Sequence, residues 1–140
     1  MKNQKKFFAI AIIIGFMLPV VQSCTKYEDG PKISLRSRTE RVANTWKVDN
    51  YKVKGVDYTS LVTSYNETFT KEGNYNYEWG GASGSGTWVF QNNDDEIKIT
   101  GINNQENHIL YITKLEEKSF WYYYIDNDGD KHEYHLVNKN

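Results

Sequence analysis

The sequence has a single cysteine, Cys24, and only two prolines, Pro19 and Pro31, among its 140 residues. One cysteine cannot form an internal disulfide, so a disulfide framework is excluded. The 17 lysines and arginines nearly balance the 18 aspartates and glutamates. Because no basic stripe is present, nucleic acid is not an expected partner. The length has room for one domain.

The long apolar run of the sequence lies at its beginning, over residues 7–21, after a short segment that contains Lys2, Lys5 and Lys6. The run is short for a membrane span, and Pro19 closes it early. A basic start, an apolar middle and a small-residue end are typical of a secretory signal. We therefore predict a signal peptide over residues 1–23, with a retained anchor helix as the alternative.

The end of this run, Leu-Pro-Val-Val-Gln-Ser-Cys over residues 18–24, resembles the lipobox of bacterial lipoproteins. The resemblance implies that Cys24 is lipidated and that the signal is cut before it. Acyl chains would then anchor the protein, because each buried methylene contributes about 0.8 kcal/mol. Thr25 in place of aspartate implies an outer-membrane lipoprotein, on the periplasmic or the surface face. Without residues 1–23 the charged residues number 14 against 18, a net charge of −4.

Residues 24–43 read as a lipidated tether, because they contain Gly30-Pro31 and few apolar side chains. The end of this segment, Ser37 to Ala43, predicts one or two helical turns capped by Ser37 or Thr39. All arginines of the protein lie here, at Arg36, Arg38 and Arg41. They indicate either a small anion or headgroup patch or an ordinary solvated turn.

From Asn44 onward the pattern is almost entirely that of β-strands, with turn residues between short alternating segments. Short connections favour pairing between sequence neighbours. We therefore predict an all-β fold, a small antiparallel up-and-down barrel of eight strands over residues 44–140. The expected strands cover residues 46–53, 65–70, 74–79, 87–91, 96–100, 107–113, 120–125 and 131–137.

Aromatic residues occur at alternate positions in the middle of the chain. This period indicates half-buried strands with the rings on one face. A Gly/Ser segment, residues 80–86, reads as a mobile loop at the barrel mouth, and Gly73 suits a hairpin turn. The rings expected to face one way are those of Tyr75, Tyr77, Trp79, Trp88 and Phe90.

Several runs resemble the lipocalin-like domains of lipoproteins from Bacteroidetes-type bacteria. They are Asn-Thr-Trp-Lys-Val at 44–48, Thr-Phe-Thr-Lys-Glu-Gly-Asn-Tyr at 68–75, Gly-Thr-Trp-Val-Phe at 86–90 and Ile-Thr-Lys-Leu at 112–115. The resemblance covers roughly Cys24 to the end of the chain. It implies a small antiparallel barrel on a lipid tether, in which we expect Trp46 to plug one end.

The sequence shows no convergent nucleophile and base, so we do not expect an enzyme. On a strand, His132 and His135 would point to opposite faces, and only His108 remains to complete a metal site. We therefore expect no metal and no cofactor. The acidic run 126–130 lacks the spacing of a calcium loop and reads as a hairpin turn.

The leading functional hypothesis is a binding module that holds a small hydrophobic or amphipathic ligand. Tyrosine suits such a pocket because it offers apolar area and a polar tip. The alternative is a filled barrel that contacts an envelope protein or glycan through outward rings, Trp121 and Tyr123. The residues predicted to line the cavity are Tyr75, Tyr77, Trp88, Phe90, Tyr122 and Tyr134.

Overall fold

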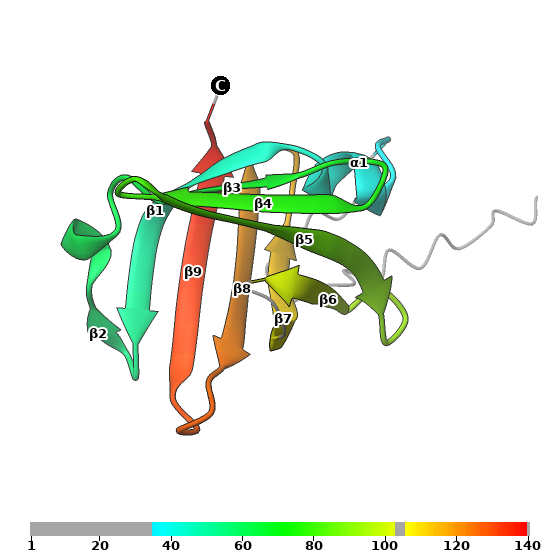
Figure 1. Cartoon of the computed structure of the whole chain (residues 1–140). Helices are drawn as coiled ribbons and strands as arrows, with labels where there is room; N and C mark the ends of the chain where they lie inside the picture. Colours follow the sequence, from blue (N-terminus) through cyan, green and yellow to red (C-terminus); the bar gives the residue numbers. More distant parts are fainter. Residues whose placement is uncertain (1–34, 103–105, 140) are drawn as a thin grey trace, which may run out of the picture.

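The computed structural model describes residues 35–102 and 106–139, most of which lie in antiparallel strands (Figure 1). A short helix, α1 (Arg38–Val42), precedes the strands, and a 3-10 turn, η1 (Thr59–Leu61), lies between the second and third. The strands are β1 (Thr45–Val53), β2 (Val56–Asp57), β3 (Asn66–Phe69), β4 (Asn74–Trp79), β5 (Ala82–Gln91), β6 (Glu96–Ile102), β7 (Glu106–Leu115), β8 (Ser119–Ile125) and β9 (Lys131–Asn138).

These strands close into an eight-stranded barrel. Consecutive strands from β3 to β9 pair with one another, and β1 pairs with both β3 and β9. The closing register runs from Trp46 opposite Asn138 to Val53 opposite His132. The two-residue strand β2 is an addition to the end of β1. The predicted all-β, up-and-down, eight-stranded barrel is therefore confirmed.

One end of the barrel is filled by large aromatic side chains. Trp46 and Phe120 are fully buried, and their ring centroids lie 5.7 Å apart. Phe69 packs edge-on against both Phe120 and Trp88. The indole N–H of Trp46 donates a 2.9 Å hydrogen bond to the carbonyl oxygen of Val42 in α1. Trp46 thus plugs the end that α1 covers, as we expected.

The helix α1 forms at the predicted place and begins at one of the predicted caps. The Ser37 hydroxyl accepts from the backbone N–H of Glu40, and the Glu40 carboxylate accepts from the backbone N–H of Ser37. This capping box satisfies two backbone donors that a helix start leaves open. Val42 is fully buried, so this end of the expected tether packs on the barrel.

The three arginines link this helix and its lead-in to the closed end of the barrel, each through a partner on a turn or strand far away in the sequence. Arg38 and Arg41 are partly buried, which differs from a solvated turn, whereas Arg36 is exposed. The partners are Glu117 for Arg36 (3.0 Å), Asp94 for Arg38 (2.6 Å) and the carbonyl oxygen of Leu115 for Arg41 (2.8 Å).

The predicted mobile loop over residues 80–86 is wrong. Only Gly80 and Gly81 form the turn, both with positive φ, and β5 begins at Ala82. The segment up to Gly86 pairs residue by residue with β4. Serine and glycine give no hydrophobic alternation, so the strand could not be recognised from its period.

Two glycines of β5 are needed because other groups lie where a side chain would be. A Cβ on Gly84 would meet the ring of Tyr77 at 2.2 Å, and one on Gly86 would meet the carbonyl oxygen of Thr100 at 2.4 Å. Glycine therefore lets the Tyr77 ring lie across β5 and lets β6 approach closely at its bulge.

The side chains of β8 alternate as predicted. Phe120 and Tyr122 are buried inside the barrel, and Tyr124 also faces inward. The outward rings stack on neighbouring strands, as cross-strand pairs do. Trp121 stacks on His135 at 4.0 Å, and Tyr123 stacks on Tyr111 at 4.9 Å.

The acidic run after β8 forms a hairpin turn, as predicted. The Asp126 carboxylate accepts hydrogen bonds from the backbone N–H groups of Asp128 and Asp130, and Gly129 has φ +84°. In the part of the chain that the structure describes, no helix is long and apolar enough to cross a membrane. The predicted signal peptide and Cys24 lie outside the described residues.

Candidate functional site

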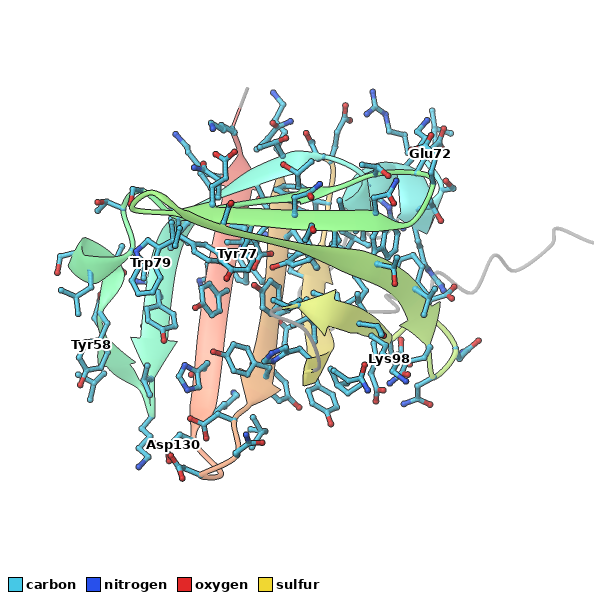
Figure 2. The ribbon with its side chains drawn as sticks, in the orientation of Figure 1. Tyr58, Glu72, Tyr77, Trp79, Lys98 and Asp130 are labelled. Carbon is cyan, nitrogen blue, oxygen red and sulfur yellow. The ribbon has the colours of Figure 1, made fainter. Side chains whose placement is uncertain are left out.

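The barrel is hollow at the end opposite α1. A cavity of about 490 Å³ lies there, within the range of sites for small molecules. Tyr58, Leu61 and Trp79 line it and are also exposed, so the cavity meets the surface beside η1 and the end of β4 (Figure 2). Most of the wall is aromatic or aliphatic. The other lining residues are Tyr51, Val53, Val62, Tyr65, Glu67, Tyr75, Tyr77, Ile99, Ile102, His108, Leu110, Tyr122, Tyr124 and Tyr134.

Four of the six residues predicted to line a cavity do so, namely Tyr75, Tyr77, Tyr122 and Tyr134. The prediction was wrong for Trp88 and Phe90, which do not line it. Trp88 is buried, donates to the carbonyl oxygen of Thr70 at 2.9 Å and packs on Phe90 at the closed end. All six face inward or nearly so, but no residue of β5 is among those that line the cavity.

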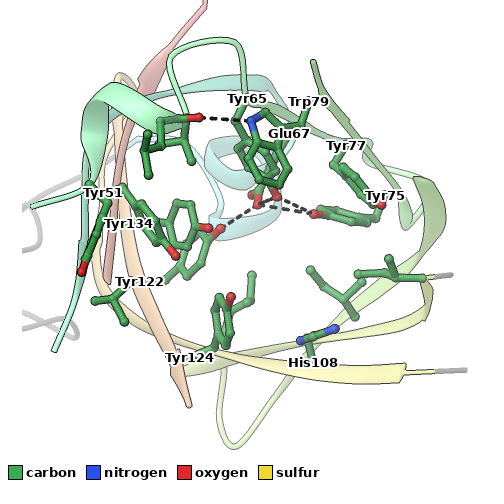
Figure 3. A pocket seen from close by; sticks show the side chains of 17 residues that line it. Tyr51, Tyr65, Glu67, Tyr75, Tyr77, Trp79, His108, Tyr122, Tyr124 and Tyr134 are labelled. Atoms are coloured by element: carbon green, nitrogen blue, oxygen red, sulfur yellow. Dashed lines mark hydrogen bonds between the residues drawn. The ribbon is translucent and has the colours of Figure 1, made fainter. Parts of the chain in front are cut away.

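A glutamate stands in the wall of this otherwise apolar space. Glu67 of β3 is only 2% exposed, and its Oε1 atom accepts three tyrosine hydroxyl hydrogen bonds (Figure 3). The donors are Tyr122 at 2.6 Å, Tyr65 at 2.7 Å and Tyr75 at 3.3 Å. The other carboxyl oxygen, Oε2, has no hydrogen-bond partner among the described residues.

The burial of this cluster sets its ionisation. Burial raises the pKa of the Glu67 carboxyl, and the three donated hydrogen bonds oppose that rise. Burial, and then the negative charge of Glu67, raise the pKa values of Tyr65, Tyr75 and Tyr122 far above their usual range. The tyrosines therefore remain protonated, which suits them as hydrogen-bond donors and not as bases.

No protein-family model matches this chain, and no curated protein matches its sequence.

A second polar chain runs from the cavity wall to the turn between β8 and β9. The Tyr51 hydroxyl lies 2.7 Å from Nδ1 of His132, and Nε2 of His132 lies 3.0 Å from a carboxylate oxygen of Asp126. The ring of Tyr124 stacks on His132 at 4.6 Å. The hydrogen bond from His132 lowers the pKa of Asp126, whereas burial raises the pKa of Tyr51. A protonated Tyr51 indicates a positioning network and not a nucleophile.

His132 faces the inside of β9, and His135 stacks on the outer side against Trp121, as their spacing on a strand predicted. Within residues 35–102 and 106–139, no three His, Cys, Asp or Glu side chains are grouped so that they could hold a metal ion.

The mouth of the cavity is edged by exposed apolar groups. Leu61 is 66% exposed and Trp79 is 47% exposed, and the Trp79 indole N–H donates to the Leu61 carbonyl oxygen at 3.4 Å. This contact ties η1 to the end of β4. Apolar side chains at the rim of a pocket are typical of a site that admits an apolar molecule.

Sequence reasoning missed Glu67, Tyr65, His108 and Tyr124 as members of the site. A signal for Glu67 existed, because it is a charged residue on the inward face between Tyr65 and Phe69. An acid at an inward strand position must be either functional or fully satisfied, and Glu67 is satisfied at only one of its oxygens.

Proposed function

We propose that this protein is a lipid-anchored envelope lipoprotein whose barrel binds a small hydrophobic or amphipathic ligand. The observation that carries the binding role is the hollow end of the barrel, a cavity of about 490 Å³ with a mostly aromatic and aliphatic wall. A barrel that served only as a scaffold would gain stability by filling this space.

The distribution of aromatic side chains supports binding over the scaffold alternative. The outward rings of Trp121 and Tyr123 are covered by stacked neighbours, and Lys114 and Lys131 lie 4.4 and 4.5 Å from their ring centroids. Three exposed large apolar residues, Tyr58, Leu61 and Trp79, lie instead at the cavity mouth. Ligand binding is therefore favoured over docking through the β8 surface.

We propose binding and not catalysis because the polar groups of the cavity hold each other in place. The tyrosines around Glu67 stay protonated, and the Tyr51 hydroxyl is bonded to His132. The anchoring part of the proposal rests on the resemblance of residues 18–24 to a lipobox. Its test is metabolic labelling with a fatty acid, which Cys24→Ser should abolish together with sedimentation in the membrane fraction.

The binding role can be tested with N-phenyl-1-naphthylamine, which is uncharged at neutral pH and fluoresces in apolar surroundings. Leu110 is buried in the cavity wall, so Leu110→Phe should fill part of the space and weaken probe binding severalfold. Val89 points outward from β5 and is exposed, so Val89→Phe is the matched control and should bind like the wild type.

Native mass spectrometry of the full-length chain after exposure to a lipid and metabolite extract would then identify the occupant. Absence of probe binding to the wild type, or equal binding by Leu110→Phe in a folded protein, would contradict the proposed function.

A further inference from the structure

The lining of the cavity has few side chains that can carry charge. Glu67 is the only Asp or Glu among its lining residues, and none of these described residues is lysine or arginine. His108 is the remaining ionisable residue besides the tyrosines, and it packs edge-on against Tyr124. Figure 3 places His108 across the cavity from Glu67. The electrostatic character of the interior therefore depends on Glu67.

The hydrogen bonds around Glu67 favour its ionised form. All three tyrosine hydroxyls donate to the same oxygen, and two of them do so at 2.6 and 2.7 Å. Lengths of about 2.5–2.7 Å are usual for a hydroxyl bonded to an anionic oxygen. Three donors on one oxygen also hold the carboxyl group in a single orientation. Oε2 has no protein donor among the described residues and is itself buried, so the carboxyl group acts on the cavity through its charge.

A buried carboxylate without a counter-charge is costly, and a cation in the cavity can lower that cost. A protonated amine would supply this opposite charge. Such a group would also favour the ionised form of Glu67, in opposition to burial.

The aromatic wall adds a second attraction for a cation. The ring centroids of Tyr134 and its neighbours lie close together, at 4.5 Å to Tyr51, 5.3 Å to Tyr122 and 5.9 Å to Tyr65. The faces of such rings are negative and attract ammonium groups within about 6 Å. Lipophilic groups of the same ligand would contact the aliphatic lining.

We propose that the ligand is an amphipathic amine, attracted by the opposite charge of the Glu67 carboxylate and held by the tyrosine rings around it. This inference rests on the proposed function, because it names the chemical class that the cavity accepts.

The test uses three small naphthyl probes of nearly equal size and different charge. They are 2-(1-naphthyl)ethylamine, 2-(1-naphthyl)ethanol and 1-naphthylacetate, titrated into the full-length chain at pH 7.5 by calorimetry. The amine should bind on the order of tenfold more tightly than the alcohol, because only the amine carries a charge opposite to that of Glu67. The acetate should bind more weakly than both.

A pair of glutamate variants assigns this preference to one carboxyl group. Glu67→Gln should lower the affinity for the amine to that for the alcohol and leave the alcohol unaffected. Glu78 lies on the outward, exposed side of β4, so Glu78→Gln is the matched control and should retain the preference.

The outcomes separate this inference from the proposed function. Equal affinities for amine and alcohol, or tighter binding of the acetate, would overturn the amine assignment. Binding of the alcohol would still support the cavity as a binding site. Failure of all three probes and of the neutral fluorescent probe would overturn both. The comparison of probes on the wild type holds even if Glu67→Gln does not fold.

Discussion

Replacing Glu67 with glutamine should change how the stability of the protein depends on pH. Folding raises the pKa of this carboxyl because the group becomes buried. Between the unfolded and the folded pKa the native state holds more protons, so stability falls as pH rises. The loss begins near the ordinary value of 4.5 and is complete above the folded pKa.

The magnitude follows from the same shift. Each pKa unit by which folding raises the Glu67 value costs about 1.4 kcal/mol at pH above both values. Glutamine has nearly the same shape, keeps one oxygen that can accept the tyrosine hydrogen bonds, and never ionises. The free energy of unfolding of the wild type should therefore fall relative to that of Glu67→Gln as pH rises from about 4 to 8.

Urea unfolding followed by tryptophan fluorescence across this pH range would measure the difference. Glu78→Gln removes an exposed carboxylate of the neighbouring strand and should give a curve parallel to the wild type. If the free energies of unfolding of Glu67→Gln and the wild type change in parallel with pH, or if the wild type gains stability relative to Glu67→Gln as pH rises, burial does not oppose the ionisation of Glu67.

Two further predictions concern the barrel itself. Gly86→Ala should lower the free energy of unfolding by about 1–3 kcal/mol, because its Cβ would lie 2.4 Å from the Thr100 carbonyl oxygen, whereas exposed Ser85→Ala should change it by less than about 0.5 kcal/mol in the same urea assay. Asp126→Asn should reduce the loss of stability at acid pH. The hydrogen bond from His132 lowers the pKa of Asp126. The stabilisation by Asp126 is therefore present above its unfolded pKa and is lost as pH falls through its folded pKa. If the free energy of unfolding falls as steeply with decreasing pH in Asp126→Asn as in Asp128→Asn, this role is wrong.

The strand pattern was readable from the sequence because period-two alternation is a local property. It gave the inward face of β6, β8 and β9 correctly, including Ile97, Tyr122 and Tyr134. It failed at 82–86, where Gly84 and Gly86 occupy inward positions. These glycines are needed because of their contacts with Tyr77 and Thr100. Those contacts lie across strands, and the alternation within one strand does not contain them.

The site could be predicted only in part, for a similar reason. Alternation says that Trp88 and Tyr75 face inward, but their height along the barrel axis depends on the stagger between strands. Trp88 therefore joined the closed end and Tyr75 the cavity. The meeting of Glu67 with Tyr122, fifty-five residues later, and of Tyr51 with His132, eighty-one residues later, depends on closure of the whole barrel.

The packing of α1 makes the two ends of the barrel different. The chain enters the described structure at Leu35, beside α1, and α1 covers the end of the barrel that Trp46 fills. The mouth of the cavity lies at the other end, beside η1 and Trp79. An anchor attached through the residues before Leu35 would thus hold the protein by its sealed base. The open rim would lie at the opposite end of the barrel from that attachment.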